Sequence, residues 1–279
     1  MPLNLMYITN DPAVALIAEK NGVDRIWVDL EKLGKEERQK GVDSVKSDHS
    51  IKDVTVLSNV LTKSELMVRV NPWNEASDRE IEQVIDYGAN RIMLPMWKTK
   101  KETDCFLNLV RGRVKTTLLL ETKEAVECLD EVLHNQYIDE IHIGLNDLHL
   151  SFGLTFMFEL LTNGVVEKLC KKLQGKGILY GFGGIAKLGA GMIPAEKIIM
   201  EHYRLGSTRA ILSRSFCNSD EIKDINEIEN IFSKNIKELR RFEEDVSHFT
   251  SDKFLFNKQT LENDIAQIVE MQKRKNADE

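Results

Sequence analysis

Two carboxylates that follow short apolar runs are the residues of this sequence best placed to do chemistry. Glu121 follows the run at 116–120, and Asp147 lies shortly after the run at 138–143. The segment between them, 123–134, has apolar residues at helical spacing, so the pattern predicts a strand–helix–strand unit with parallel strands. Parallel strands end at the same edge of a sheet, and we therefore expect the two carboxylates to lie close together there.

Two carboxylates at such an edge, with backbone carbonyls and water nearby, suit a hard divalent cation such as Mg²⁺ or Mn²⁺. A plainer interpretation also fits, because acids are common at strand ends. In that case Glu121 caps the following helix and Asp147 sits in a turn. Spacing alone leaves both interpretations open.

The length and composition are those of an ordinary globular chain: 279 residues, of which 42% are hydrophobic and 30% are charged. This length fits one α/β barrel of about 250 residues or two smaller domains. A net charge of −7 and the lack of a basic block argue against a nucleic-acid partner. No apolar run is long enough for a membrane span, no secretory signal is evident, and the four cysteines form no CxxC pair. We expect a cytoplasmic protein.

Eight β-like runs alternate with helical segments along the chain. This alternation favours an α/β fold of the (β/α)₈ TIM-barrel type over an open sheet. We assign residues 1–222 to the barrel and residues 223–279, which are mostly helical and highly charged, to a C-terminal extension that packs on the barrel or on a neighbouring subunit. The predicted strands are 3–9, 24–31, 65–71, 91–96, 116–120, 138–143, 178–182 and 209–212.

Barrel enzymes carry their chemistry at the rim formed by the carboxyl ends of the strands. At the predicted rim, Asp29 and Glu31 follow the second strand and Arg69 lies near the end of the third. Arg214 follows the eighth strand, where it either binds a phosphate or second carboxylate of the substrate or pairs with surface acids. A fixed cation among several acids is typical of a site for a small anionic substrate.

Two other features have plain interpretations. The glycine-rich segment 181–191, GFGGIAKLGAG, lacks the GK[ST] ending of a phosphate-binding loop, and we interpret it as a rim loop after the seventh strand. His142 lies inside a strand between apolar neighbours, so we interpret it as a structural histidine with hydrogen-bond partners rather than as a metal ligand.

Five ordered motifs, WVDLE, VRVNPW, GANRIMLPM, LLLET and IHIGLNDLHLSFG, resemble those of the HpcH/HpaI aldolase and citrate lyase β-subunit superfamily. The resemblance covers roughly residues 24–153 and continues more loosely to 216. It implies a TIM barrel and a divalent-metal-dependent carbon–carbon lyase, a class II pyruvate-type aldolase. Its substrate would be a small 2-keto acid or a carboxylated sugar-like compound, cleaved through a metal-stabilised enolate.

The resemblance also implies roles for individual residues. Glu121 and Asp147 match the pair that holds Mg²⁺, Mn²⁺ or Co²⁺. Arg69 matches the arginine that binds the substrate carboxylate and faces the developing enolate. Asp29 and Glu31 match acids that organise metal-bound water. The backbone amides that would face the substrate carboxylate are those of Gly144, Leu145 and Asn146. Members of the superfamily assemble as trimers or hexamers with exchanged terminal helices, so we expect a homo-oligomer.

The sequence departs from the aldolase branch at the general base. The histidine that follows the second-strand glutamate in aldolases is Lys32 here, and a lysine is a poor base near pH 7 unless its pKa is lowered. His49, at the end of the polar segment 32–50, is a second candidate base, and water is a third. We interpret the segment 32–50 as a helix with a mobile loop or as a lid. The glutamine that aldolases place two residues before the metal glutamate is Leu119 here, and the second strand reads DLEK where citrate lyases read DLED.

Three functions therefore remain open: the pyruvate-type aldolase, a citryl- or malyl-thioester lyase, and a non-catalytic barrel that binds a small acid or acts as a scaffold. In each case the expected ligand is a small carboxylate, and neither a nucleic acid nor a membrane is expected as a partner.

Overall fold

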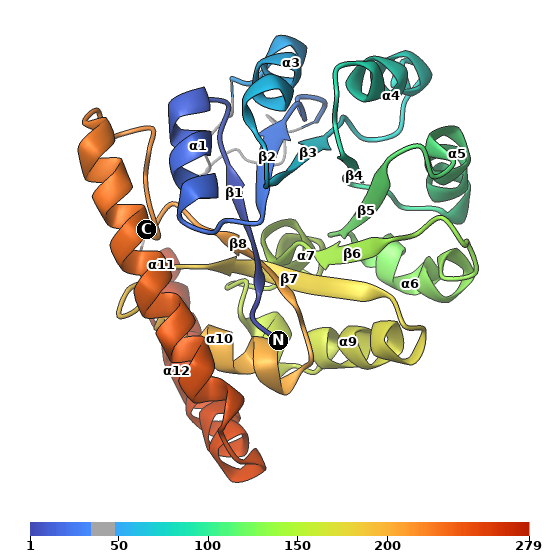
Figure 1. Cartoon of the computed structure of the whole chain (residues 1–279). Coiled ribbons are helices and arrows are strands. Elements are labelled where there is room, and N and C mark those ends of the chain that lie inside the picture. The colour runs from blue at the N-terminus through green and yellow to red at the C-terminus, as the bar shows by residue number, and fades with distance from the viewer. Residues whose placement is uncertain (35–47, 279) are drawn as a thin grey trace.

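Eight parallel strands close into a barrel in which each strand pairs with its neighbours in chain order and β8 pairs with β1. This computed structural model describes residues 1–34 and 48–278. Figure 1 shows the strands at the centre and the helices around them. The predicted (β/α)₈ fold is confirmed. The strands are β1 (Asn4–Ile8), β2 (Arg25–Asp29), β3 (Glu65–Arg69), β4 (Arg91–Leu94), β5 (Lys115–Leu120), β6 (Glu140–Ile143), β7 (Leu179–Ile185) and β8 (Arg209–Leu212).

Helices follow the strands and cover the outside of the barrel. Their starts carry ordinary capping chemistry; the side chain of Asp11, for example, accepts hydrogen bonds from the first amides of α1. Two short helices after β6 were not predicted, because four to seven residues are too few to show helical periodicity. The helices up to β8 are α1 (Pro12–Lys20), α3 (Ile51–Val60), α4 (Ser77–Asp86), α5 (Lys100–Val110), α6 (Lys123–Val132), α7 (Leu145–Ser151), α8 (Glu159–Thr162), α9 (Val165–Gly175) and α10 (Ala195–Arg204).

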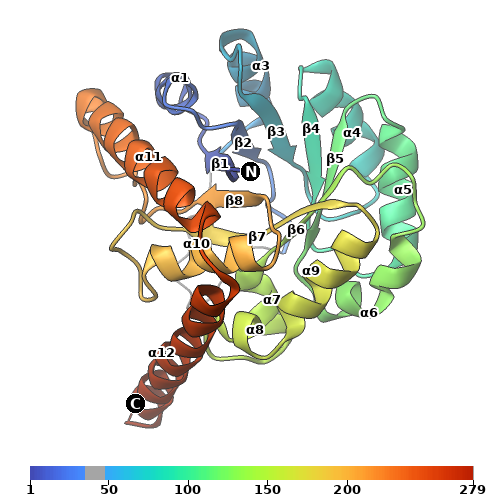
Figure 2. The same ribbon diagram turned by 60° about the horizontal axis from the view of Figure 1, so that its bottom comes forward.

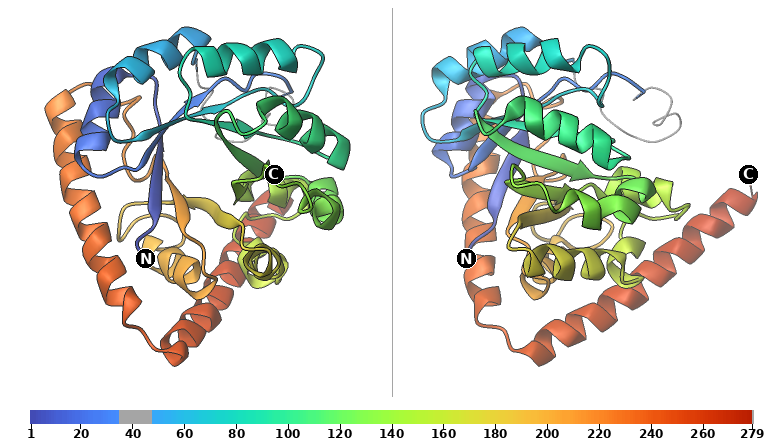
Figure 3. Two further views of the ribbon diagram at one scale, coloured as in Figure 1. Left: turned by 45° about the vertical axis from the view of Figure 1, so that its right-hand side comes forward. Right: turned by 90° about the vertical axis from the view of Figure 1, so that its right-hand side faces the viewer.

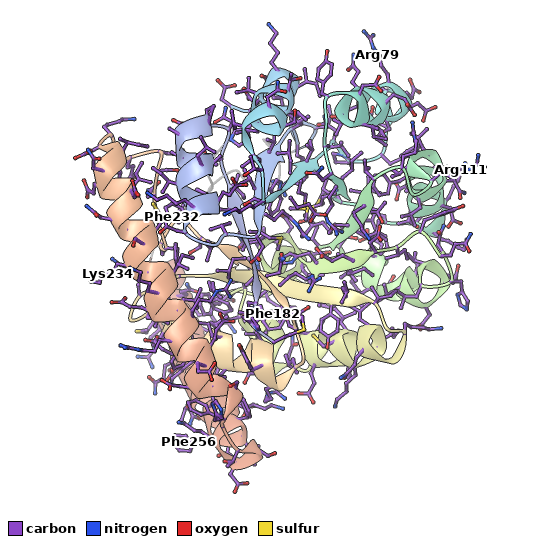
Figure 4. All side chains as sticks on the ribbon, in the orientation of Figure 1. Arg79, Arg111, Phe182, Phe232, Lys234 and Phe256 are labelled. Atoms are coloured by element: carbon purple, nitrogen blue, oxygen red, sulfur yellow. The ribbon has the colours of Figure 1, made fainter. Side chains whose placement is uncertain are left out.

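Helix α11 (Ile225–Ser247) completes this outer ring, because it packs against both α10 and α1. Phe232, labelled in Figure 4, is fully buried and meets the ring of Tyr7 edge-on, with 5.0 Å between the ring centroids. The carboxylate of Glu243 accepts a hydrogen bond from the amide of Leu3 at 2.6 Å. Helix α11, which belongs to the predicted C-terminal extension 223–279, thus packs on the barrel and takes the place of the eighth outer helix.

Helix α12 (Ser251–Asp278) lies outside the ring and crosses α10 and α8. Leu261, Ile265 and Ile268 bury its inner face. Figures 2 and 3 show its carboxyl-terminal part extending beyond the barrel. Among the described residues, no helix has the length and apolar character that a membrane crossing requires.

The barrel interior is layered, because alternate residues of each strand point inward. Five inward-facing residues, Met6, Trp27, Met67, Met93 and Leu119, form a small apolar cluster separate from the main core between the barrel and its helices. This apolar layer separates a charged cluster at the amino ends of the strands from a second one at the carboxyl-end rim.

The lower charged cluster is built on Glu140, which is completely buried. Its carboxylate accepts hydrogen bonds from Arg25 at 2.8 and 3.2 Å and from Arg209 at 2.7 Å. Arg25 and Arg91 also donate to Glu65, at 2.6 and 3.0 Å. Burial by itself would raise the pKa of Glu140, but the three arginines, Arg25 foremost, hold it well below its usual range.

We expect Glu140→Ala to destabilise the fold by about 3–5 kcal/mol, because it leaves buried arginines without their central counter-ion. Urea unfolding at pH 7 measures the change. Glu82→Ala, which removes the partner of Arg113 in an exposed ion pair, is the control and should have a much smaller effect. A stability close to wild type for Glu140→Ala would show that the cluster does not hold the barrel together.

Candidate active site

The rim is centred on Arg69, the last residue of β3, which pairs with the last residue of β2 in the sheet register. Its Nε and Nη2 both donate to the carboxylate of Asp29 at 2.8 Å, and its Nη1 lies 3.3 Å from Glu31. The guanidinium carbon lies 5.0 Å from the centre of the Trp27 ring, a cation–π contact. Burial opposes the charge on Arg69, but Asp29 and Glu31 raise its pKa above the ordinary value. The structure therefore brings together three residues that the sequence predicted at the rim.

His49 also reaches this cluster, from a position just before α3. It is buried, and its Nδ1 accepts a hydrogen bond from the backbone amide of Asp29 at 2.9 Å. An imidazole that accepts at Nδ1 carries its proton on Nε2 when it is neutral. The sequence left open whether His49 reaches the site or is a solvated loop residue; in the structure it is buried beside Asp29, with its unprotonated nitrogen directed at the backbone.

Lys32 directly follows Glu31 in the chain, and its side chain is exposed to solvent. The chain here is held by Asn71, whose side-chain oxygen accepts hydrogen bonds from the amides of Lys32 and Leu33 at 2.9 and 3.0 Å. Asn71 in turn donates to Glu80 of α4 at 2.8 Å. The proposed lid or loop at 32–50 falls largely on residues 35–47, outside the described residues.

Glu121 follows β5 and is almost fully buried. One carboxylate oxygen, Oε1, accepts a hydrogen bond from the amide of Met96 at 3.0 Å. The other, Oε2, lies against Gly144, where a Cβ atom would come within 2.9 Å of it, so a side chain at 144 would displace the carboxylate. Burial, followed by the charges of Asp147 and Glu31, raises the pKa of Glu121 well above the ordinary value.

The sequence pattern suggested that Asp147 lies at the end of a strand. In the structure it lies in the first turn of α7 instead. It is half-buried, and its charge is the second cause of the raised pKa of Glu121. The amide of Gly144 donates to the carbonyl of Leu120 at 3.0 Å, so it is occupied within the sheet. The amides of Leu145 and Asn146 are the first of α7, which have no partner inside the helix.

Other predicted features lie around this centre. Arg214 is exposed in the turn after β8. The segment predicted as a rim loop at 181–191 begins inside β7, which continues to Ile185 with an irregular register between Gly181 and Gly184. His142 is fully buried, and burial lowers its pKa to about 4. It lies near the backbone of Gly183, yet within the described structure neither ring nitrogen makes a hydrogen bond of normal geometry. The prediction of a hydrogen-bonded structural histidine was wrong in that respect.

The donor set fits a hard divalent cation. Asp29, Glu31, Glu121 and Asp147 carry four negative charges when ionised, and Arg69 supplies one positive charge. Burial and the charges of Asp147 and Glu31 raise the pKa of Glu121 in spite of the opposing charge of Arg69. Within the described residues, no three His, Cys, Asp or Glu side chains are arranged to hold a metal ion together. A site with two carboxylates suits Mg²⁺, which usually keeps several waters and substrate oxygens as ligands.

Met96 is a part of the site that the sequence did not single out, whereas Asn71 ends the predicted third strand, 65–71, and was expected at the rim. Asn71 occurs in the quoted motif VRVNPW, and its spacing of two from Arg69 placed it on the same side of the strand. Met96 acts through its backbone, so its residue type gave no signal.

Solved structures with the same fold include an aldolase and two synthases. An HpcH/HpaI aldolase from Desulfitobacterium hafniense DCB-2 aligns with 86% of this chain and 93% of its own, at a TM-score of 0.59 and 16% identity. The citrate synthase SbnG aligns with 86% of this chain and 94% of its own, at a TM-score of 0.56 and 16% identity. Macrophomate synthase aligns with 75% of this chain and 77% of its own, at a TM-score of 0.52 and 15% identity. At these identities the likeness shows the fold alone.

No curated protein sequence matches the chain. Residues 4–159 match the profile of the HpcH/HpaI aldolase/citrate lyase family. The match covers more than half of the 279 residues and includes β1 to β6 with Arg69, Glu121 and Asp147. The chain therefore belongs to the HpcH/HpaI aldolase/citrate lyase family.

Proposed function

We propose that this protein is a divalent-metal-dependent carbon–carbon lyase of the pyruvate-aldolase type, acting on a small 2-keto acid. The observation that carries the proposal is the charge arrangement at the rim. One half-buried cation, Arg69, lies among acids, and burial, followed by the charges of Asp147 and Glu31, raises the pKa of Glu121. A divalent cation would relieve this excess of negative charge, and Arg69 would attract the carboxylate of the substrate.

Arg69 binds the substrate carboxylate with the end of its guanidinium group. Its Nε and one side of Nη2 are held by Asp29, and Nη1 also lies near Glu31. A guanidinium has five N–H groups, so Nη1 and Nη2 each keep a further N–H for a ligand. Asp29 thereby fixes the orientation of Arg69 before substrate binds, which lowers the cost of ordering the site.

Glu121 and Asp147 would hold the metal ion, and their oxygen atoms suit Mg²⁺, Mn²⁺ or Co²⁺. When bound, a divalent cation supplies Lewis-acid stabilisation of the negative charge that develops on the keto oxygen during carbon–carbon cleavage. The amides of Leu145 and Asn146 at the start of α7 would face the substrate carboxylate. The apolar layer of Met6, Trp27, Met67, Met93 and Leu119 forms a floor that excludes water from below.

Neither predicted base is well placed to take a proton. His49 already uses its unprotonated Nδ1 to accept from the amide of Asp29, which leaves Nε2 as a donor. The side chain of Lys32 is exposed to solvent. We therefore assign His49 to positioning Asp29, and a water molecule beside Asp29 and Glu31 is the proposed proton acceptor.

The thioester-lyase alternative is less well supported. Coenzyme A binding sites are usually basic in part, and two lysines near this rim are already paired with acids. The Nζ of Lys98 lies 3.5 Å from Glu124, and Lys100 pairs with Asp104. Turnover of an acyl-thioester with no turnover of 2-keto acid aldols would reverse this preference.

We expect calorimetry to detect binding of Mn²⁺ to the metal-free protein, with higher affinity when pyruvate or its enolate mimic oxalate is present. Glu121→Ala and Asp147→Ala should abolish that binding and the lyase activity while the fold survives. Glu127→Ala, on the exposed face of α6, is the matched control and should bind as wild type does. Wild-type protein that binds no Mn²⁺ would favour the non-catalytic barrel, and activity retained by metal-free Glu121→Ala would refute a metal-dependent mechanism.

Glu121→Gln should stabilise the metal-free protein at pH 8 but not at pH 5. Because the pKa of Glu121 is raised in the folded state, the folded protein binds its proton more tightly than the unfolded chain does. Stability of the wild type therefore falls as pH rises above the ordinary carboxyl pKa of about 4.5, and glutamine removes this loss. We expect a gain on the order of 1–3 kcal/mol at pH 8, measured by urea unfolding in EDTA. Equal stabilities at both pH values would mean that Glu121 carries no unfavourable charge.

We also propose a homo-oligomer, a trimer or hexamer, in which α12 contacts a neighbouring subunit. The exposed side chain of Met271 in α12 supports this arrangement, and Figure 3 shows the carboxyl-terminal part of α12 extending beyond the barrel. Light scattering on the purified full chain should give the mass of three or six chains of 31.9 kDa. A monomer at micromolar concentration would refute the proposal.

A further inference from the structure

Met96 has a backbone conformation that its residue type does not explain. Its φ of +52° lies in the left-handed region, which side chains with a Cβ seldom adopt. Within residues 1–34 and 48–278, Arg111 is the one other non-glycine residue with a positive φ, at +47°. Arg111 is the C-cap of α5, where a left-handed residue is ordinary. Met96 is in the loop after β4, so no helix end accounts for it.

The residues around Met96 hold this conformation in place. Pro95 is buried, and the proline ring fixes its own φ. Trp97 is 1% exposed, and its carbonyl accepts a hydrogen bond from Thr122 Oγ1 at 2.8 Å. The same hydroxyl caps α6 by accepting from the amide of Ala125 at 3.1 Å. Strained backbone persists where its surroundings fix it in this way, and such residues cluster at functional sites.

The left-handed conformation of Met96 determines the direction of its backbone amide. It donates to Oε1 of Glu121 at 3.0 Å. The other oxygen of that carboxylate faces Gly144, which has no side chain to obstruct it. The two contacts come from the loops after β4 and β6, on either side of β5, and together they fix the rotation of the Glu121 carboxylate.

We propose that Met96 is a positioning residue for the metal site: its left-handed backbone aims an amide at Oε1 of Glu121 and so presents Oε2 to the cation. The inference rests on the proposed function, because it assumes that Glu121 is a metal ligand. It concerns the backbone of residue 96 rather than its thioether, and this distinction makes it testable.

Two substitutions at position 96 distinguish the effect of the backbone conformation from the effect of the side chain. Met96→Asn removes the thioether but tolerates the left-handed region, whereas Met96→Val removes it and disfavours that region because valine is β-branched. We expect Met96→Asn to bind Mn²⁺ with nearly wild-type affinity. Met96→Val should bind about 10- to 100-fold more weakly, the usual effect of losing a group that orients a metal ligand. Calorimetry measures both affinities without any assay of activity.

Arg111→Asn and Arg111→Val are the matched controls. They make the same two changes at the other left-handed residue, which Figure 4 labels on α5 at the edge of the barrel. Thermal unfolding should show that valine costs stability at both positions. Affinity for Mn²⁺ should fall at position 96 alone. A merely structural role for Met96 would lower the melting temperature and leave the affinity unchanged.

The outcomes separate this inference from the proposed function. Wild-type protein that binds no Mn²⁺ overturns both. Wild-type binding together with equal affinities for Met96→Asn and Met96→Val overturns the role of Met96 alone. Should Met96→Val not fold, the α-hydroxy acid analogue of methionine at position 96 replaces the N–H by an ester oxygen and deletes only the hydrogen-bond donor. A wild-type affinity in that ester variant also overturns the inference.

Discussion

A closed barrel of eight strands has an interior that only side chains can fill, and water has little access to it. A charge placed there must therefore be paired, or its protonation state shifts. Both ends of this barrel place charges inside, and they differ in how completely those charges are matched. At the amino end, Glu140 has three arginine neighbours and its pKa falls. At the carboxyl end, Glu121 is buried beside the charges of Asp147 and Glu31, and its pKa rises.

This contrast distinguishes the charges that stabilise the fold from those at the candidate active site. The lower cluster is balanced by residues of the chain itself, so it is complete in the folded protein. At the rim, two acids, Asp29 and Glu31, already contact Arg69. The pKa of Glu121 is raised by its burial and then by the charges of Asp147 and Glu31, in spite of the opposing charge of Arg69. Such a site gains most from a ligand that is itself cationic, and a metal ion brings an anionic substrate with it.

The fold and the main rim residues were predictable because they depend on patterns that a sequence displays. Alternating apolar runs and amphipathic segments indicated eight strands, and carboxylates just past those runs indicated the rim. Short elements such as α7 were missed, and with it the placement of Asp147 on a helix. For α11 the sequence left open whether the helix packs on the barrel or on a neighbouring subunit, because helical periodicity does not reveal which neighbour a helix packs against. The tautomer of His49 and the bend at Met96 depend on contacts between segments distant in the chain.

The family resemblance left the general base of the site open. It directed attention to Lys32, where aldolases have a histidine, and to His49 as its substitute. In the structure, the nitrogen of His49 that would act as a base is bonded to the amide of Asp29, and Asp29 holds Arg69. Under the proposed function, His49 therefore supports the cation of the site rather than accepting a proton. The groups that set the positions of Arg69 and Glu121 are accordingly backbone amides and small or polar neighbours, and reactivity at this rim depends on their geometry as much as on the acids themselves.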